Sequence, residues 1–76
     1  MLYPIKNRLV TCLIEIIDEN RINNFKTQEI ADYLGVTARH VRRILGELYT
    51  ENIIEKQGQS IHILNKKSLY KYAIKE

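Results

Sequence analysis

Three arginine side chains cluster in the middle of the sequence, in a stretch without acidic residues. They are Arg39, Arg42 and Arg43, and residues 36–46 contain neither Asp nor Glu. A guanidinium group stays charged at physiological pH and can donate two parallel hydrogen bonds to a phosphate or to O6 and N7 of guanine. The cluster therefore predicts a polyanionic partner, and double-stranded DNA is the first candidate. The alternative is a basic surface that only contacts water.

The charge of the chain is divided unevenly between its two halves. The 76 residues carry a net charge of +3. Residues 1–35 contain four basic and five acidic side chains, whereas residues 36–76 contain eight basic and four acidic ones. The positive charge lies on the same half as the arginine cluster, as expected for a surface that meets a nucleic acid.

The arginines need a rigid element to hold them, and the surrounding pattern predicts a helix over residues 38–50. Four apolar residues recur there at the spacing of one buried helix face, namely Val41, Ile44, Leu45 and Leu48. The arginines lie about 200° around the helix from this stripe and project away from the core. Side chains near the start of such a helix reach base edges in the major groove. We therefore expect Arg39, Arg42 and Arg43 to read DNA bases.

A shorter helix is predicted just before this one, over residues 28–34. Thr27 is a suitable N-cap, Gly35 can adopt the left-handed conformation that ends a helix, and Thr37 can cap the next helix. Five residues fit positions 1, 5, 9, 15 and 18 of a twenty-residue helix-turn-helix frame, namely Thr27, Ala31, Gly35, Val41 and Ile44. The two helices are therefore expected to meet at a tight turn.

The rest of the chain is expected to support these two helices. Further helices are predicted from Ile5 to about Asn20 and, capped by Asn65, up to close to Glu76, with a polar loop over residues 20–26. Residues 53–64 alternate as a β-hairpin with a polar tip at residues 57–60. The first helix has a broad apolar face, which either packs within this domain or meets another domain or subunit. The expected fold is mainly α with a small β-hairpin, a winged helix-turn-helix, in a single domain over residues 1–76.

Residues 27–73 resemble the winged helix-turn-helix of the Crp/Fnr transcription regulators. Gly35, Thr37, Arg43, Leu48 and Ile54 occupy positions of the family's pattern. The resemblance implies a bacterial transcription regulator that binds double-stranded DNA sequence-specifically, with Arg43 reading a guanine. At Arg39 many members instead carry an acidic residue that accepts a hydrogen bond from cytosine N4, which an arginine cannot do. The recognised DNA sequence is therefore expected to differ from that of the best-known members.

Phosphate contacts are expected at the helix starts and at the hairpin tip. Helix N-termini expose free N–H groups, and an uncharged tip does not repel a phosphate. The predicted contacts are Thr27, Gln28, Thr37, His40, Gln57, Gly58 and Gln59. The resemblance implies this role for Gln28, Thr37 and the tip. The alternatives are threonines that only cap helices and a tip that only contacts water.

The resemblance also has implications for the rest of the protein. Family members carry an N-terminal effector domain and a dimerisation helix ahead of this module. The chain is therefore expected to be a fragment of a homodimeric regulator, with RNA polymerase as a further possible partner. Two joined modules would contact DNA half-sites roughly 34 Å apart.

The sequence offers little support for other functional classes. Cys12, His40 and His62 are too few and too widely separated to suggest a metal site, and no catalytic triad or phosphate-binding loop is present. We expect no enzymatic activity, metal or cofactor in this chain. No apolar run approaches the roughly 20 residues of a membrane span, and the single cysteine fits a reducing cytoplasm. The rival interpretation is a winged helix that binds another protein.

Overall fold

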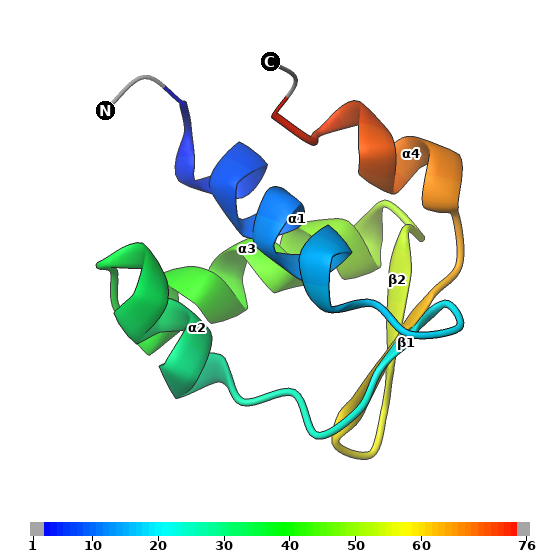
Figure 1. The fold of residues 1–76 in the computed structure, drawn as a ribbon, viewed down its shortest axis with the longest axis horizontal. Coiled ribbons are helices and arrows are strands. Elements are labelled where there is room, and N and C mark those ends of the chain that lie inside the picture. Colours follow the sequence, from blue (N-terminus) through cyan, green and yellow to red (C-terminus); the bar gives the residue numbers. More distant parts are fainter. Residues whose placement is uncertain (1–2, 75–76) are drawn as a thin grey trace.

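The computed structural model describes residues 3–74, which form four helices and three short strands. In chain order these are α1 (Ile5–Ile16), β1 (Arg21–Ile22), α2 (Thr27–Leu34), α3 (Ala38–Thr50), β2 (Ile54–Gln57), β3 (Ser60–Ile63) and α4 (Lys66–Lys71). The strands form one antiparallel sheet in the order β1-β3-β2. In Figure 1 the hairpin tip and α4 lie at opposite ends of this sheet. The arrangement confirms the expected winged helix-turn-helix.

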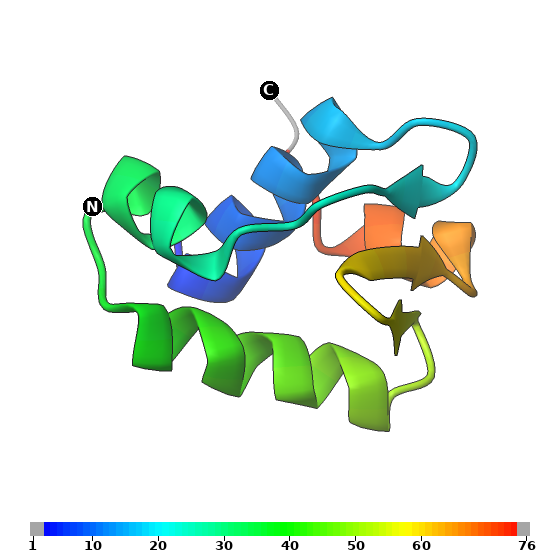
Figure 2. The same cartoon turned by 90° about the horizontal axis from the view of Figure 1, so that it is seen from below.

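One apolar core joins the helices to the sheet. The predicted stripe of α3 is confirmed, because Val41, Ile44, Leu45 and Leu48 are all buried. The same cluster contains the buried residues Leu9, Leu13, Ile22, Ala31, Ile54, Ile61 and Leu69. In Figure 2, α3 runs along one side of the molecule, beneath α1 and α2. Burying one such side chain stabilises a fold by about 1.5–3 kcal/mol, so the core holds α3 firmly in place.

The first helix is shorter than predicted. It ends at Ile16, whereas the sequence suggested an end near Asn20. The chain turns sharply through Glu19 and Asn20, whose φ values are 52° and 63°. Backbone hydrogen bonds between Asp18 and Arg21, of 2.8 and 3.1 Å, close this turn. Two consecutive left-handed residues give the twist of a hairpin connection, so the chain folds back instead of continuing the helix.

The segment 20–26, predicted as a loop, contains strand β1. Arg21 pairs with His62 and Ile22 pairs with Ile61 in antiparallel register with β3. Only 3% of the Ile22 surface is exposed, so this side chain anchors the strand in the core. A strand of two residues carries no recognisable alternation, and it exists only because β3 offers it a partner. The wing is therefore a three-stranded sheet and not only a hairpin.

The hairpin itself and the cap of the last helix follow the prediction. Gln57 pairs with Ser60 across a two-residue turn, in which Gly58 has a φ of 62°. The Asn65 side chain accepts a hydrogen bond of 3.0 Å from the Ser68 backbone N–H and caps α4. The helix ends at Lys71, well before the predicted end near residue 76, and residues 75–76 lie outside the described part.

A cluster of polar side chains ties α1 to the end of α3 and to the residue that follows α4. Lys6 Nζ lies 3.2 Å from Glu47 Oε1, 2.7 Å from Glu51 Oε2 and 4.4 Å from the centre of the Tyr72 ring. The Tyr72 hydroxyl donates to Glu51 Oε1 at 2.7 Å. Burial alone would lower the pKa of Lys6, but hydrogen bonds to Glu51, Glu47 and Tyr72 outweigh it and raise this pKa. The hydrogen bonds from Lys6 and Tyr72 lower the pKa of Glu51.

We expect the Glu51 interactions to make folding sensitive to acid. A carboxylate whose pKa falls on folding stabilises the native state above its unfolded pKa, and this contribution is lost as the pH falls through the folded pKa. Glu51→Gln should therefore lower the melting temperature at neutral pH and reduce its decline below about pH 4.5. Melting curves across this pH range test the prediction, with the exposed Glu19→Gln as the control. Equal acid sensitivity of wild type and Glu51→Gln would contradict it.

Candidate nucleic-acid interface

The turn between α2 and α3 is closed by the backbone. Gly35 has a φ of 74°, and its N–H donates to the Asp32 carbonyl at 3.2 Å. The Val36 N–H donates to the Ala31 carbonyl at 3.0 Å. Paired bonds of this kind, around a left-handed glycine, end a helix and fix the direction of the following chain. The predicted tight turn at Gly35 is confirmed.

The two threonines predicted as N-caps behave differently. Thr37 caps α3, and its side chain accepts a hydrogen bond of 3.0 Å from the His40 backbone N–H. The prediction for Thr27 is wrong, because Thr27 is the first residue inside α2. The capping position belongs to Lys26, whose side chain makes no capping hydrogen bond. A lysine side chain has no acceptor, so it cannot satisfy the first N–H groups of the helix.

The three arginines are exposed on α3. Among residues 3–74 no ion pair is formed by Arg39, Arg42 or Arg43 with an acidic side chain. At about 100° per residue, Arg39 and Arg43 lie roughly 40° apart around the helix axis and opposite the buried stripe. Arg42 lies about 100° from Arg43, on the flank that carries Tyr49. Arg42 lies about 60° from Arg39, so the three arginines spread over about 100° of the helix surface.

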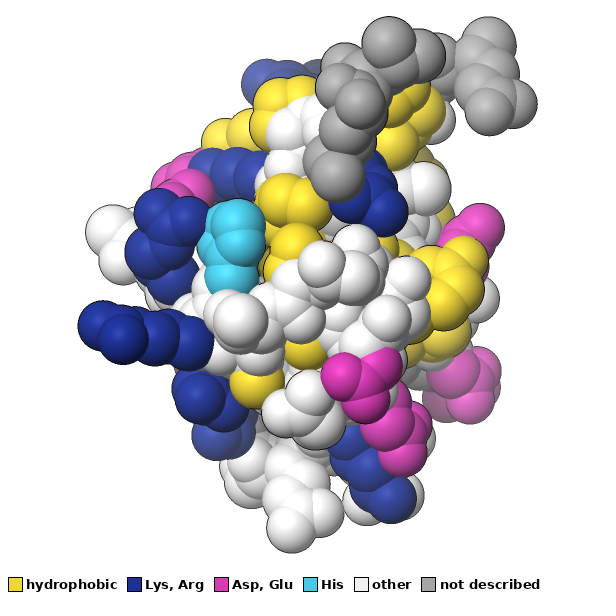
Figure 3. Space-filling view, turned by 90° about the vertical axis from the view of Figure 1, so that its left-hand side faces the viewer, with side chains coloured by type: hydrophobic (Ala, Val, Ile, Leu, Met, Phe, Trp, Pro, Cys, Tyr) yellow, Lys and Arg dark blue, Asp and Glu magenta, His cyan; other side chains and the backbone are white. Residues whose placement is uncertain are grey.

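The arginines and their neighbours form a basic surface at the start of α3. A shallow hollow there is lined by Thr37, Arg39, His40, Arg42 and Arg43. In Figure 3 several basic side chains project along one edge of the molecule next to a histidine. The acidic side chains on this face lie mostly away from that edge. The surface is therefore positive and sterically open, as contact with a polyanion requires.

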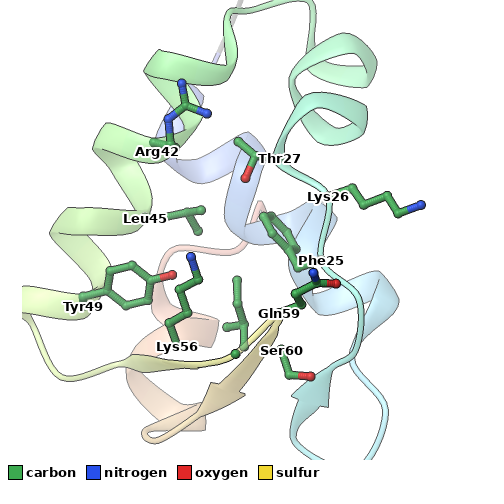
Figure 4. A pocket seen from close by; sticks show the side chains of 11 residues that line it. Phe25, Lys26, Thr27, Arg42, Leu45, Tyr49, Lys56, Gln59 and Ser60 are labelled. Atoms are coloured by element: carbon green, nitrogen blue, oxygen red, sulfur yellow. The ribbon is translucent and has the colours of Figure 1, made fainter.

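A groove separates the Arg42 flank of α3 from the hairpin and from the start of α2. Its volume is about 540 Å³. It is lined by Phe25, Lys26, Thr27, Arg42, Leu45, Tyr49, Lys56, Gly58, Gln59, Ser60 and Ile61. Figure 4 shows the Arg42 guanidinium and the Lys56 ammonium on either side of Leu45, whereas Lys26 points away from the groove. Of the residues that were predicted to contact DNA, Thr27, Arg42, Gly58 and Gln59 meet here.

Comparison with known proteins agrees with this geometry. The family of Crp-like helix-turn-helix domains matches residues 7–72. The chain belongs to this family. The curated "Probable transcriptional regulator flp" of Lacticaseibacillus casei is 40% identical over 45 residues, which make up 59% of this Crp-like chain and 20% of that protein.

Solved structures of other proteins share the fold of the Crp-like domain. FixK2 from Bradyrhizobium japonicum matches with a TM-score of 0.87 and 25% identity, over 99% of this chain and 41% of FixK2. TTHB099, a CRP-family transcriptional regulator from Thermus thermophilus, matches with a TM-score of 0.79 and 18% identity, over 91% of this chain and 40% of that one. The Crp-like chain thus spans less than half the length of these relatives.

Several of the predicted phosphate contacts in the Crp-like domain have partners within the protein. The Gln28 amide donates to the Asp32 carboxylate at 2.8 Å, and the Gln57 amide donates to the Glu55 carboxylate at 2.7 Å. The backbone carbonyl of Gln59 accepts a hydrogen bond of 2.9 Å from the Phe25 backbone N–H. These amide side chains are exposed and can exchange partners, but a phosphate would have to compete with a carboxylate for Gln28 and Gln57.

Two residues that line the groove of the Crp-like domain, Lys56 and Tyr49, were not among the site residues predicted from the sequence. Lys56 lies in β2, next to the predicted tip, and Tyr49 lies one turn after Leu45 on α3. Lys56 is a basic residue beside the predicted tip, and this position could have suggested a contact with DNA. The alternation of side chains along a strand could also have indicated which face of the hairpin Lys56 occupies. Its placement opposite Arg42 depends on how the hairpin packs on α3, which no local pattern encodes.

The described part of the Crp-like domain shows neither a metal-binding cluster nor a membrane-spanning helix. Residues 3–74 contain no group of three or more His, Cys, Asp or Glu side chains that could hold a metal ion. Within the same range, every helix is too short or too polar to cross a membrane. His62 is half-buried in β3, the central strand of the sheet, where it pairs with Arg21 of β1 and Glu55 of β2.

We expect Thr37→Ala to destabilise the Crp-like domain by about 0.5–2 kcal/mol, because the His40 N–H at the start of α3 loses its acceptor. Chemical denaturation of the two proteins measures this difference. Thr50→Ala is a matched control, since the Thr50 hydroxyl only donates to the Gly46 carbonyl within α3. Thr37→Ser should keep most of the stability. A Thr37→Ala variant as stable as the control would show that the cap contributes nothing.

Proposed function

We propose that this Crp-like domain binds double-stranded DNA sequence-specifically, with α3 in the major groove, as the DNA-reading part of a bacterial transcription regulator. The observation that carries the proposal is the division of α3 into two faces. Val41, Ile44, Leu45 and Leu48 hold one face in the core, while the arginines extend from the other without internal ion pairs among the described residues. Membership of a helix-turn-helix family whose relatives are transcription regulators supports the same role.

The proposed base readers are Arg39 and Arg43. Both project from the first half of α3, opposite the buried stripe, where a helix in the major groove meets base edges. Each can donate two hydrogen bonds to O6 and N7 of guanine. Neither can accept a hydrogen bond, so we expect the contacted positions to prefer guanine over cytosine on the strand that is read. The third arginine, Arg42, points in a different direction.

The proposed backbone contacts surround these readers. Thr37 and His40 lie at the start of α3, and Gly58 and Gln59 form the hairpin tip. Gln28 and Thr27 lie in the first turn of α2, whose leading N–H groups lack a side-chain cap. Such contacts give affinity that falls steeply with salt but carry no sequence information. A single domain is therefore expected to bind weakly, and a homodimer of the intact regulator to bind tightly, with RNA polymerase as a further proposed partner.

A titration of the isotope-labelled chain with duplex DNA tests the proposal. The duplexes are those that the chain itself selects from a random pool. We expect amide shift changes along residues 37–46 and at the hairpin tip, and an affinity whose logarithm falls linearly with the logarithm of salt concentration. Absence of shifts at residues 37–46, even at low salt, would overturn DNA reading by α3 and favour a module that binds another protein.

A further inference from the structure

Arg42 lies at the border between the surface that carries Arg39 and Arg43 and the groove beside the hairpin. Around the axis of α3 it lies about 100° from Arg43 but only about 20° from Tyr49, and it lines the groove between α3 and the hairpin. The three arginines span about 100° of the helix surface, and Arg42 lies at the edge of this span that borders the groove. The groove, rather than the bases, is the nearer destination of the Arg42 side chain.

The groove has the charge of an anion site. None of its eleven lining residues is acidic. Arg42 and Lys56 approach it from α3 and from β2 and form no ion pair among the described residues. Lys26 is excluded from the pair, because its side chain points away and its Nζ lies 4.0 Å from Glu29. Two cations without a carboxylate between them attract one anionic group more strongly than either does alone.

Part of the groove lining is apolar, which a bare phosphate would not require. Leu45 and Ile61 are buried beneath it, while Phe25 and Tyr49 are half-buried at its sides. Burial raises the pKa of Tyr49, so its hydroxyl stays protonated and available as a donor. Deoxyribose presents C–H groups next to its phosphate, and these suit aromatic and aliphatic walls.

We propose that this groove holds one sugar–phosphate unit of the DNA backbone, with Arg42 and Lys56 contacting the phosphate and Tyr49 packing against the sugar. The inference rests on the proposed DNA binding and assigns to Arg42 a role different from base reading. Specificity then depends on Arg39 and Arg43, while Arg42 and the wing together fix the register of α3 on the duplex.

Salt dependence and base preference separate this role from base reading. Each lost phosphate contact reduces the slope of log affinity against log salt by about 0.9. Because the two side chains share one phosphate, we expect Arg42→Gln and Lys56→Gln each to reduce the slope by part of this amount and to leave the selected DNA sequence unchanged. Lys67→Gln removes an equal charge from an exposed position on α4, and it should change neither the salt slope nor the selected sequence. All four proteins should melt at similar temperatures, because the substituted side chains are exposed.

Duplexes with a single neutral methylphosphonate linkage identify the contacted phosphate. At one position, the neutral linkage should weaken binding of the wild type several-fold but leave binding of the Arg42→Gln/Lys56→Gln double variant unchanged. Such coupling places both side chains on that phosphate. Tyr49→Ala should weaken binding of normal and neutral duplexes by the same factor, because it removes contact with the sugar and not with the charge.

Three results would overturn the inference. If Arg42→Gln relaxes the preference at one base pair and keeps the salt slope, Arg42 is a base reader and the proposed DNA binding still holds. If no linkage shows coupling to the double variant, the groove does not hold the backbone. If free deoxyribose 5-phosphate saturates the groove at micromolar concentration, its ligand is a free sugar phosphate. Failure of every duplex to bind would instead overturn the proposed function itself.

Discussion

Replacement of Leu48 by alanine is expected to lower the free energy of unfolding by about 2–5 kcal/mol, because it leaves a cavity where a fully buried side chain was. Leu48 lies on the buried face of α3, in the same core cluster as Leu13 of α1 and Ile54 of β2. Small domains are stable by about 5 kcal/mol or somewhat more. The loss is therefore large enough to unfold a substantial fraction of the protein at physiological temperature.

Urea denaturation of the whole chain measures this change. Leu64→Ala is the matched control, since it removes the same atoms from a side chain that is 53% exposed. The control should change the free energy of unfolding by less than about 0.5 kcal/mol. A similar small effect for Leu48→Ala would show that α3 is not held by its buried stripe, and the division of α3 into two faces would lose its basis.

Replacement of Arg43 by alanine should weaken binding to the selected DNA site by about 1–3 kcal/mol and flatten the preference at one base pair. The expected cause is the loss of two parallel hydrogen bonds to a guanine. Arg43 is exposed on α3, so the fold should remain intact. Selection from random DNA, followed by titration of each single-base variant of the site, locates the affected pair.

Arg43→Lys separates the charge of this side chain from its geometry. Lysine keeps one positive charge but lacks the planar fork that matches guanine. The salt dependence of Arg43→Lys should resemble that of the wild type, while its preference at the affected base pair should fall. Unchanged selectivity in both variants would remove Arg43 from base reading and leave Arg39 as the remaining candidate.

The reading of DNA sequence by this domain is expected to depart from that of relatives that carry a carboxylate at the position of Arg39. At this position the carboxylate of the relatives accepts hydrogen bonds, whereas the guanidinium of Arg39 only donates them. Together with Arg43, Arg39 places two guanidinium groups roughly 40° apart on one helix face. Two such side chains suit two guanines rather than a guanine and a cytosine. The half-site selected by this chain is therefore expected to be rich in guanine on the contacted strand.

Local sequence was sufficient to predict the helix-turn-helix. The stripe of α3, the left-handed Gly35 and the Thr37 cap each depend on residues a few positions apart, and the structure confirms all three. Helix periodicity, capping and turn formation are short-range interactions. For the same reason the hairpin tip around Gly58 and the Asn65 cap could be predicted from the residues themselves.

The structure differs from the sequence predictions at the ends of helices and in the pairing of strands that are far apart in the chain. Ile16 and Ile17 continue the apolar pattern of α1, but a left-handed turn through Glu19 and Asn20 ends the helix and directs the chain to β3. The strand β1 has no pattern of its own, since Ile22 needs Ile61 as its partner. Thr27 has the chemistry of a cap, yet it lies inside α2.

The sequence by itself determined that α3 has one buried and one basic face, because both faces follow from the spacing of residues within one helix. Only the tertiary structure decided which of the arginines lies beside the wing. Lys56 reaches the side of α3 that carries Arg42 because buried Ile54 and Ile61 pack the sheet against the core. That juxtaposition joins residues distant in the chain through many weak apolar contacts, and no short stretch of sequence contains it.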